Sequence, residues 1–167
     1  MAKKGFQSSP NKPFQLWLGL SMVVIILDQI SKLIVLKTIP LHASVRLNDF
    51  FNWVLVFNPG AAFSFLADGA GWQKWFFIGI GLIATVVMIW LIFRHEKQTM
   101  FCFSISMILG GAVGNLIDRF THGAVVDFID IYYSHYHWPA FNLADSAITL
   151  GTTLLIVDEL RRVIKQR

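Results

Sequence analysis

Charge is scarce in this sequence. Charged residues make up 14% of the 167 residues and hydrophobic residues 55%, whereas roughly a quarter of a typical soluble domain is charged. Residues 75–93 and 99–117 contain no charged side chain at all. Each run is long enough to cross a bilayer as a helix, which takes about 20 residues. The shortage of charge excludes an ordinary soluble domain and predicts an integral membrane protein.

Cysteine is almost absent as well. The only one, Cys102, lies inside an apolar run, so an intrachain disulfide and a thiolate metal site are both excluded. His135 and His137 have no carboxylate or third histidine at the spacing of a zinc protease. We therefore expect Cys102 to be a buried structural thiol, and we expect no metal.

Four apolar stretches predict four membrane-spanning helices, at about residues 14–36, 75–93, 99–117 and 139–157. The chain is too short for a second domain. The expected fold class is an all-α membrane protein with four transmembrane helices, a single domain over residues 1–167. Its outer loops are expected at about residues 37–71 and 118–138.

The outer loops contain β-strand patterns. Residues 52–57 are β-branched and aromatic, which is typical of a strand, and residues 45–47 are a candidate partner. We expect a small extracytoplasmic β-rich subdomain between spans one and two, and a further short strand at residues 125–129. The apolar residues 61–66 are expected to lie on the membrane surface.

Basic residues indicate the orientation of the chain. They stand before the first span, between the second and third spans and after the fourth, at Lys3, Lys4, Lys12, Arg94, Lys97, Arg161, Arg162, Lys165 and Arg167. Cytoplasmic loops carry the excess of lysine and arginine, so we predict a multi-pass protein with both termini in the cytoplasm. Although the net charge is +4, the basic residues flank apolar helices and form no groove-reading motif, so nucleic acid is not an expected partner.

Two aspartates in apolar settings are the candidate chemistry. Asp127 follows Ala-Val-Val, and Asp145 opens the fourth span. An ionisable side chain at membrane depth is costly and calls for a partner or a function. Two carboxyls that share an apolar site cannot both ionise easily, which leaves one acid and one base for splitting an amide with water. The helix N-terminus favours Asp145 as the base.

A structural interpretation competes for Asp145. Asn142 and Asp145 are three residues apart at the start of the fourth span. That spacing is typical of a capping box, in which both side chains bond free backbone N–H groups.

Asn58, before Pro59 and Gly60, has two interpretations as well. It either begins a turn or points its amide at a bound peptide backbone.

Polar residues within the spans are candidates for the same site. Asp28 and Lys32 are four residues apart and meet on one helix face. They form either a salt bridge that reaches toward the outer interface or a support for the polar network of the site. Asn115, Asp118 and Arg119 share a face at the end of the third span. They form either a solvated helix end or a polar cluster aimed at the aspartates.

Two other classes of function remain open at this point. A small proton-coupled carrier would relay protons through Asp28, Asp127 and Asp145, but the spans show no internal repeat. A non-enzymatic assembly factor would use Gly110 and Gly114, a small-xxx-small pair that permits close helix contact. Such a factor would tolerate the loss of either aspartate.

Five segments taken together resemble a known family. They are DQISK at 28–32, NPGAAFS at 58–64, GGAVGNLIDR at 110–119, GAVVDF at 123–128 and FNLADS at 141–146. In this order they resemble the bacterial lipoprotein signal peptidases, or signal peptidases of type II, from about residue 14 to 160. The resemblance implies an intramembrane aspartic endopeptidase of the bacterial cytoplasmic (inner) membrane. Its active site would lie toward the extracytoplasmic face.

The resemblance also implies roles for single residues. Asp127 and Asp145 match the catalytic pair of that family, and Asp28 matches a supporting position, with Lys32 beside it. Positions that contact substrate or inhibitor in the family match Asn58, Asn115, Arg119 and Asn142. Pro59 departs from the family, in which residues such as tyrosine or threonine follow the asparagine. It alters the stiffness of the loop and leaves the aspartate pair untouched.

The implied substrates are prolipoproteins, cut just before a cysteine that carries a diacylglyceryl group, and membrane lipids surround the site. We expect a monomer that needs no metal or organic cofactor and is blocked by the cyclic peptide globomycin. The outer loop with Trp53 and Phe63 is expected to close over the substrate groove.

Overall fold

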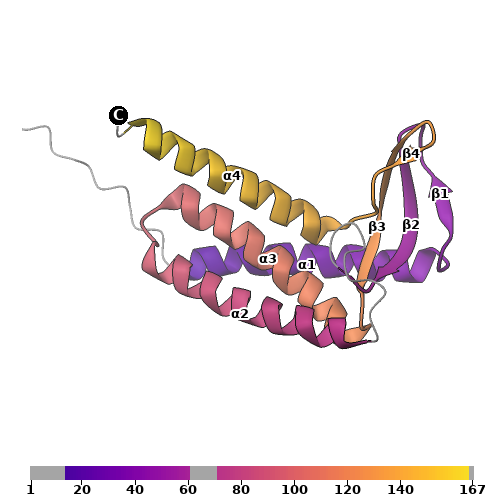
Figure 1. Ribbon diagram of the computed structural model, residues 1–167, viewed down its shortest axis with the longest axis horizontal. Helices are drawn as coiled ribbons and strands as arrows, with labels where there is room; N and C mark the ends of the chain where they lie inside the picture. The colour runs from indigo at the N-terminus through magenta and orange to yellow at the C-terminus, as the bar shows by residue number, and fades with distance from the viewer. Residues whose placement is uncertain (1–13, 61–70, 166–167) are drawn as a thin grey trace, which may run out of the picture.

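The computed structural model describes residues 14–60 and 71–165. Within these ranges four long helices lie alongside one another, α1 (Phe14–Thr38), α2 (Trp72–Arg94), α3 (Thr99–Thr121) and α4 (Leu143–Lys165). A small sheet stands at one end of them, opposite the end at which the C-terminus lies (Figure 1). The four predicted helices are confirmed. The largest shift in a boundary is in α4, which ends at Lys165 rather than at residue 157 and begins at Leu143 rather than at residue 139.

Three of the described helices, α1, α2 and α3, are long and apolar enough to cross a membrane. In lipid every backbone N–H and C=O group needs a partner within the protein, and a helix provides one. Helix α4 has 23 residues, as α2 and α3 do, but it is less apolar because it carries charged residues near both ends. Its role as a fourth span stays a prediction.

Helix α3 is the centre of the bundle and packs against the other three helices (Figure 1). Two glycines permit this close packing. A Cβ atom added at Gly110 would lie 2.6 Å from Cβ of Val24 in α1, and one added at Gly111 would lie 2.3 Å from the carbonyl oxygen of Ala144 in α4. The predicted close helix contact along this face is confirmed.

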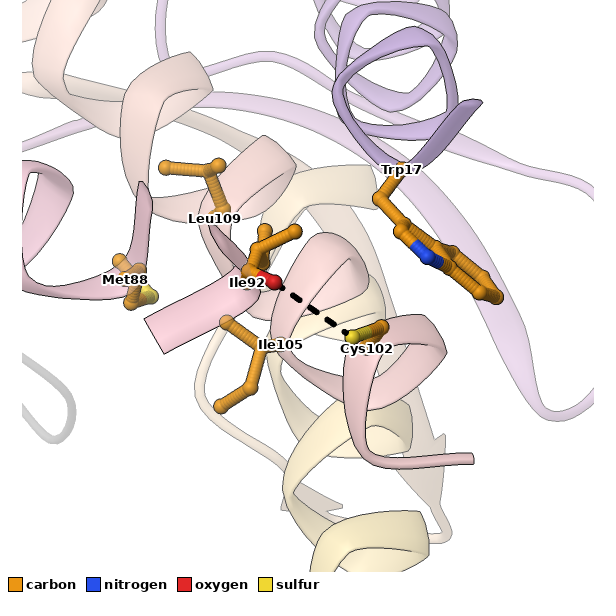
Figure 2. Packing of buried hydrophobic residues seen from close by; sticks show 6 residues of the cluster. All are labelled: Trp17, Met88, Ile92, Cys102, Ile105 and Leu109. Carbon is orange, nitrogen blue, oxygen red and sulfur yellow. Dashed lines mark hydrogen bonds between the residues drawn. The ribbon is translucent and has the colours of Figure 1, made fainter. Parts of the chain in front are cut away.

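A hydrophobic cluster holds the helices together at the end away from the sheet. Its buried side chains are Trp17, Met88, Ile92, Cys102, Ile105 and Leu109 (Figure 2). The Cys102 thiol lies 3.9 Å from the carbonyl oxygen of Ile92 and is fully buried. Cys102 is therefore a buried structural thiol, as predicted.

The sheet is antiparallel and joins both outer loops. Its order is β1 (Ser44–Arg46), β2 (Phe51–Asn58), β3 (Val125–Tyr133) and β4 (Tyr136–His137). The prediction that placed the β-rich part between spans one and two was incomplete, because β3 and β4 follow α3. The physical reason is that β2 has two edges, and the backbone groups that β1 leaves unpaired are paired by β3.

The sheet is seated on the end of α1. Val35 and Ile39 at that end pack against Leu55 of β2 and against Val126 and Phe128 of β3. This contact fixes β3, and with it Asp127, relative to the helices. The apolar residues 61–66, including Phe63, lie outside the described residues.

Candidate active site

Asp127 lies in β3, opposite Val56 of β2, and only 3% of its surface is exposed. Its two oxygens accept hydrogen bonds from side-chain amides, at 3.1 Å from Asn58 Nδ2 and at 2.7 Å from Asn142 Nδ2. Burial, followed by the nearby charge of Asp145, raises the pKa of Asp127 from 3.8 to about 7. This carboxyl therefore gives up its proton near neutral pH.

Asp145 lies in the first turn of α4 and forms the predicted capping box with Asn142. The Asn142 backbone N–H donates to Asp145 Oδ2 at 3.2 Å, and the Asp145 backbone N–H donates to Asn142 Oδ1 at 2.9 Å. The other carboxylate oxygen, Oδ1, accepts a hydrogen bond from Asn115 Nδ2 at 2.8 Å. The capping interpretation is confirmed and uses only Oδ2 of Asp145. The catalytic interpretation stays a prediction.

The two aspartates meet at one cavity of about 940 Å³. They are also linked through a single residue, Asn142, whose side-chain amide donates to Asp127 and whose backbone amide donates to Asp145. Of the other predicted polar site residues, the cavity is lined by Asn58, Asn115 and Arg119. Asn142 is fully buried behind the aspartates, and its contact with substrate stays a prediction.

The cavity has a polar end and a long apolar wall. At the polar end are the two aspartates. Apolar and aromatic side chains from the sheet, from the segment between β4 and α4, and from α4 form much of the rest of the lining, namely Val56, Phe57, Val125, Trp138, Phe141, Ile148 and Leu150. The lining continues along α4 as far as Thr153, which is two helical turns beyond Asp145. The cavity therefore suits an extended apolar ligand with a polar group near one end.

Arg119 and Asn58 shape the rim of the cavity. The Arg119 guanidinium donates to the carbonyl oxygen of Gly60 at 2.9 Å and lies 5.0 Å from the centre of the Phe77 ring. The Asn58 side chain accepts a hydrogen bond from the backbone N–H of Gly60 at 3.0 Å while its Nδ2 donates to Asp127. Asn58 therefore begins a turn and also takes part in the polar site.

A buried ion cluster lies beside the cavity. The Lys32 ammonium is 2.8 Å from Asp28 and 2.7 Å from Asp118, and at most 2% of each of these side chains is exposed. The interpretation that Lys32 and Asp28 reach toward the outer interface is wrong, because both are enclosed between helices. The contacts favour the alternative, a support for the polar network, which stays a prediction. Asp28 also accepts the backbone N–H of Ala144 in α4 at 2.9 Å.

Asp118 and Gln29 complete this cluster. The sequence predicted Asp118 as part of a polar cluster but gave it no role of its own, and Gln29 was not among the predicted site residues. Gln29 Nε2 lies 3.0 Å from Asp118 Oδ1 and 3.2 Å from Asp28 Oδ2. Asp118 Oδ2 accepts the backbone N–H of Val126, the neighbour of Asp127, at 3.1 Å. The available signals were the position of Asp118 one helical turn after Asn115 and a glutamine within an apolar span.

His137 lies away from this site. Its Nδ1 atom contacts both carboxylate oxygens of Asp130 at 2.9 Å, and Asp130 also accepts a hydrogen bond from Asn52 Nδ2 at 2.8 Å. These contacts tie β4 and β2 to β3. They hold in place the residues after β4, which contribute Trp138 and Phe141 to the cavity wall.

Comparison with known proteins agrees with this geometry. The family model for signal peptidase II matches residues 20–161. A lipoprotein signal peptidase of Cupriavidus pinatubonensis is 52% identical over 164 residues, which cover 98% of this chain and 93% of that protein. The lipoprotein signal peptidase of Burkholderia thailandensis is 54% identical over 147 residues, which cover 88% of this chain and 89% of that protein.

Solved structures have the same fold. One bacterial membrane enzyme superposes with a TM-score of 0.82 at 31% identity, over 92% of each chain. A second superposes with a TM-score of 0.78 at 30% identity, over 87% of this chain and 93% of the other. Both the sequence and the fold thus agree with the family model along nearly the whole chain. This chain therefore belongs to the signal peptidase II family, the lipoprotein signal peptidases, which are aspartic peptidases of the membrane.

Proposed function

We propose that this protein removes signal peptides from prolipoproteins and cuts just before a cysteine that carries a diacylglyceryl group. Asp127 and Asp145 are the catalytic pair. The observation that carries the proposal is the placement of both carboxyls on one cavity, bridged by Asn142. The apolar wall along α4 suits the apolar part of such a substrate, and the polar end receives the scissile amide.

Asp127 acts as the acid and Asp145 as the base. Asp127 can act as the acid because its raised pKa leaves it protonated up to near neutral pH. Asp145 accepts a proton from water while the water oxygen attacks the carbonyl carbon of the scissile amide. Asp127 donates its proton to the carbonyl oxygen, which gives a tetrahedral diol. Asp145 then gives the proton taken from water to the leaving nitrogen, and Asp127 takes a proton from one hydroxyl of the diol. The C–N bond breaks, which yields a carboxylic acid and an amine and restores the starting state of both aspartates.

The polar residues on the cavity rim bind the substrate backbone. Asn58, Asn115 and Arg119 line the cavity beside the aspartates, so each is within reach of a peptide held at the polar end. Asn142 holds the two carboxyls in place, and its assignment to substrate contact is the least direct of the four. Asp28 and Lys32 support this arrangement from behind.

The membrane orientation belongs to the same proposal. All four helices cross the bacterial inner membrane as one domain, with both termini in the cytoplasm. The sheet and the aspartates lie on the extracytoplasmic side. The basic residues Arg94, Lys97, Arg161 and Arg162 belong to the end of α2, to the turn between α2 and α3 and to the last turns of α4, and these parts of the helices lie away from the sheet (Figure 1). The enzyme works as a monomer, without a cofactor, and globomycin occupies the substrate cavity.

The test is cleavage by Asp127→Asn and Asp145→Asn variants. Each should abolish processing of a diacylglyceryl prolipoprotein in membranes, while the level of the inserted protein stays normal. Asp49→Asn is the matched control, because Asp49 is 78% exposed and pairs only with Arg46 within the described residues. Near-normal turnover by either active-site variant would remove that residue from the chemistry. Proton flux through liposomes without cleavage would favour the carrier.

A further inference from the structure

Lys32 uses all of its hydrogen-bonding capacity inside the protein. An ammonium group has three N–H donors. Those of Lys32 are directed to Asp28 Oδ2 at 2.8 Å, to Asp118 Oδ2 at 2.7 Å and to Asn115 Oδ1 at 3.0 Å. The side chain is 2% exposed and does not line the cavity. Lys32 therefore makes no contact with the reacting aspartates. Its charge acts on Asp127 only from a distance, as the smallest of the influences on the pKa of that carboxyl, and its direct contacts lead to the site through its three partners.

The partner that leads to the active site is Asn115. Its Oδ1 accepts from Lys32 and also from Asn142 Nδ2 at 3.2 Å. Its Nδ2 donates to Asp145 Oδ1 at 2.8 Å. The amide therefore has a direction, with oxygen toward two donors and nitrogen toward a carboxylate.

A reversed Asn115 amide would be repelled at both ends. Its NH₂ group would face the Lys32 ammonium and the NH₂ group of Asn142, and its oxygen would face the Asp145 carboxylate. Buried polar groups without partners are costly, and here like partners would meet. Lys32 supplies the positive charge that makes this penalty large. Asp28 and Asp118 hold the ammonium in place from the other side.

We propose that Lys32 is a positioning residue for catalysis, which fixes the orientation of the Asn115 amide so that its NH₂ group holds Asp145 in the geometry for activating water. This inference rests on the proposed function, because it deepens the role of the same site. It assigns to Lys32 an action on the rate of the chemical step, beyond a contribution to folding.

The test is a double-mutant cycle in the purified full-length enzyme, with a synthetic diacylglyceryl peptide as substrate. The four proteins are wild type, Lys32→Met, Asn115→Ala and the double variant. Loss of an outer partner that orients a metal ligand typically costs about 10- to 100-fold in activity, and we take the same range for the loss of Lys32. We expect Lys32→Met to lower kcat by about that factor, with KM changed less than about threefold. In the Asn115→Ala background the same substitution should cost less than about threefold in kcat, because the two residues act as one unit.

Two further variants make the result decisive. Lys37→Met removes a lysine from the exposed side of the same helix and should leave kcat unchanged. Lys32→Gln keeps amide donors toward Asn115 and should retain more activity than Lys32→Met. It replaces Lys32→Met in the cycle if that protein does not accumulate.

Three results would overturn the proposal. The first is a kcat of wild-type size in Lys32→Met. The second is a double variant in which the losses from Lys32 and Asn115 multiply. The third is failure of both Lys32 variants to accumulate, which would make Lys32 a folding residue. Failure of the proposed function is distinct from these. In that case the wild-type enzyme would not cut the lipidated peptide, or the Asp→Asn variants of the catalytic pair would cut it.

Discussion

Replacing Asp127 by asparagine should stabilise the folded protein at neutral and higher pH while it abolishes cleavage. Asp127 is buried, and its pKa in the folded state is about 7 instead of 3.8. Between these two pH values the folded protein keeps a proton that the unfolded chain has released. The folded state therefore loses stability as pH rises through this window, and the loss is complete above about pH 7.

The magnitude follows from the size of that window. The difference between 3.8 and about 7 corresponds to about 4 kcal/mol, at about 1.4 kcal/mol per pH unit. Asparagine has no charge to bury, so Asp127→Asn does not suffer this loss. Its own NH₂ group, however, would face a donor, either Asn58 Nδ2 or Asn142 Nδ2. That mismatch costs about 1–3 kcal/mol at every pH.

The variant should thus be less stable than wild type near pH 4 and more stable near pH 8. Thermal unfolding in detergent micelles, followed by tryptophan fluorescence, measures this difference. For a chain of this length 1 kcal/mol shifts Tm by roughly 2–4 °C. The difference in Tm between the two proteins should therefore change by roughly 8–16 °C from pH 4 to pH 8.

A surface aspartate provides the control for this measurement. Asp49→Asn should follow the wild-type curve, because Asp49 is exposed. Parallel Tm curves for Asp127→Asn and wild type between pH 4 and pH 8 would refute the reasoning. Asp127 would then not hold a proton that the unfolded chain releases, and its assignment as the acid would fail with it.

Two more outcomes are expected. The value of kcat/KM should fall about tenfold per pH unit above about pH 7, because Asp127, whose pKa is about 7, must be protonated to act as the acid. The charged groups that act on Asp127 are Asp145, Lys32 and Arg119. A rate that stays constant to pH 9 would contradict this prediction. Gly114→Ala should lower both cleavage and Tm, because the added Cβ atom would lie 2.5 Å from Asp28 Oδ2. Gly79→Ala, where nothing lies within 4 Å, is the matched control, and equal effects of the two substitutions would show that the Asp28 contact is not the cause.

The polar residues show where sequence reasoning reached its limit. The capping box of Asn142 and Asp145 was predictable, because both residues belong to one helix start and their spacing sets their geometry. The burial of Lys32 was not predictable. A lysine near a helix end reaches either toward water or toward a partner, and here the partner Asp118 comes from a helix more than 80 residues away in sequence. The choice depends on how closely α1 and α3 approach.

The sheet gives a second example. The strand patterns at residues 52–57 and 125–129 were both recognised, yet their pairing was not. A strand pattern states which residues alternate between faces, and it carries no information about which distant strand will occupy its free edge. That pairing places Asp127 opposite Val56 and beside Asn58.

The sequence by itself determined that the chain is a membrane protein of long apolar helices with an aspartate at the start of the last one. The reason is that the scarcity of charge, the length of the apolar runs and the capping spacing act locally. Only the tertiary structure decided that Asp127 and Asp145 share one cavity, that burial raises the pKa of Asp127, and that Lys32 is enclosed beside them. Those properties depend on burial and on contacts between distant segments, which the packing of α1, α3, α4 and β3 creates.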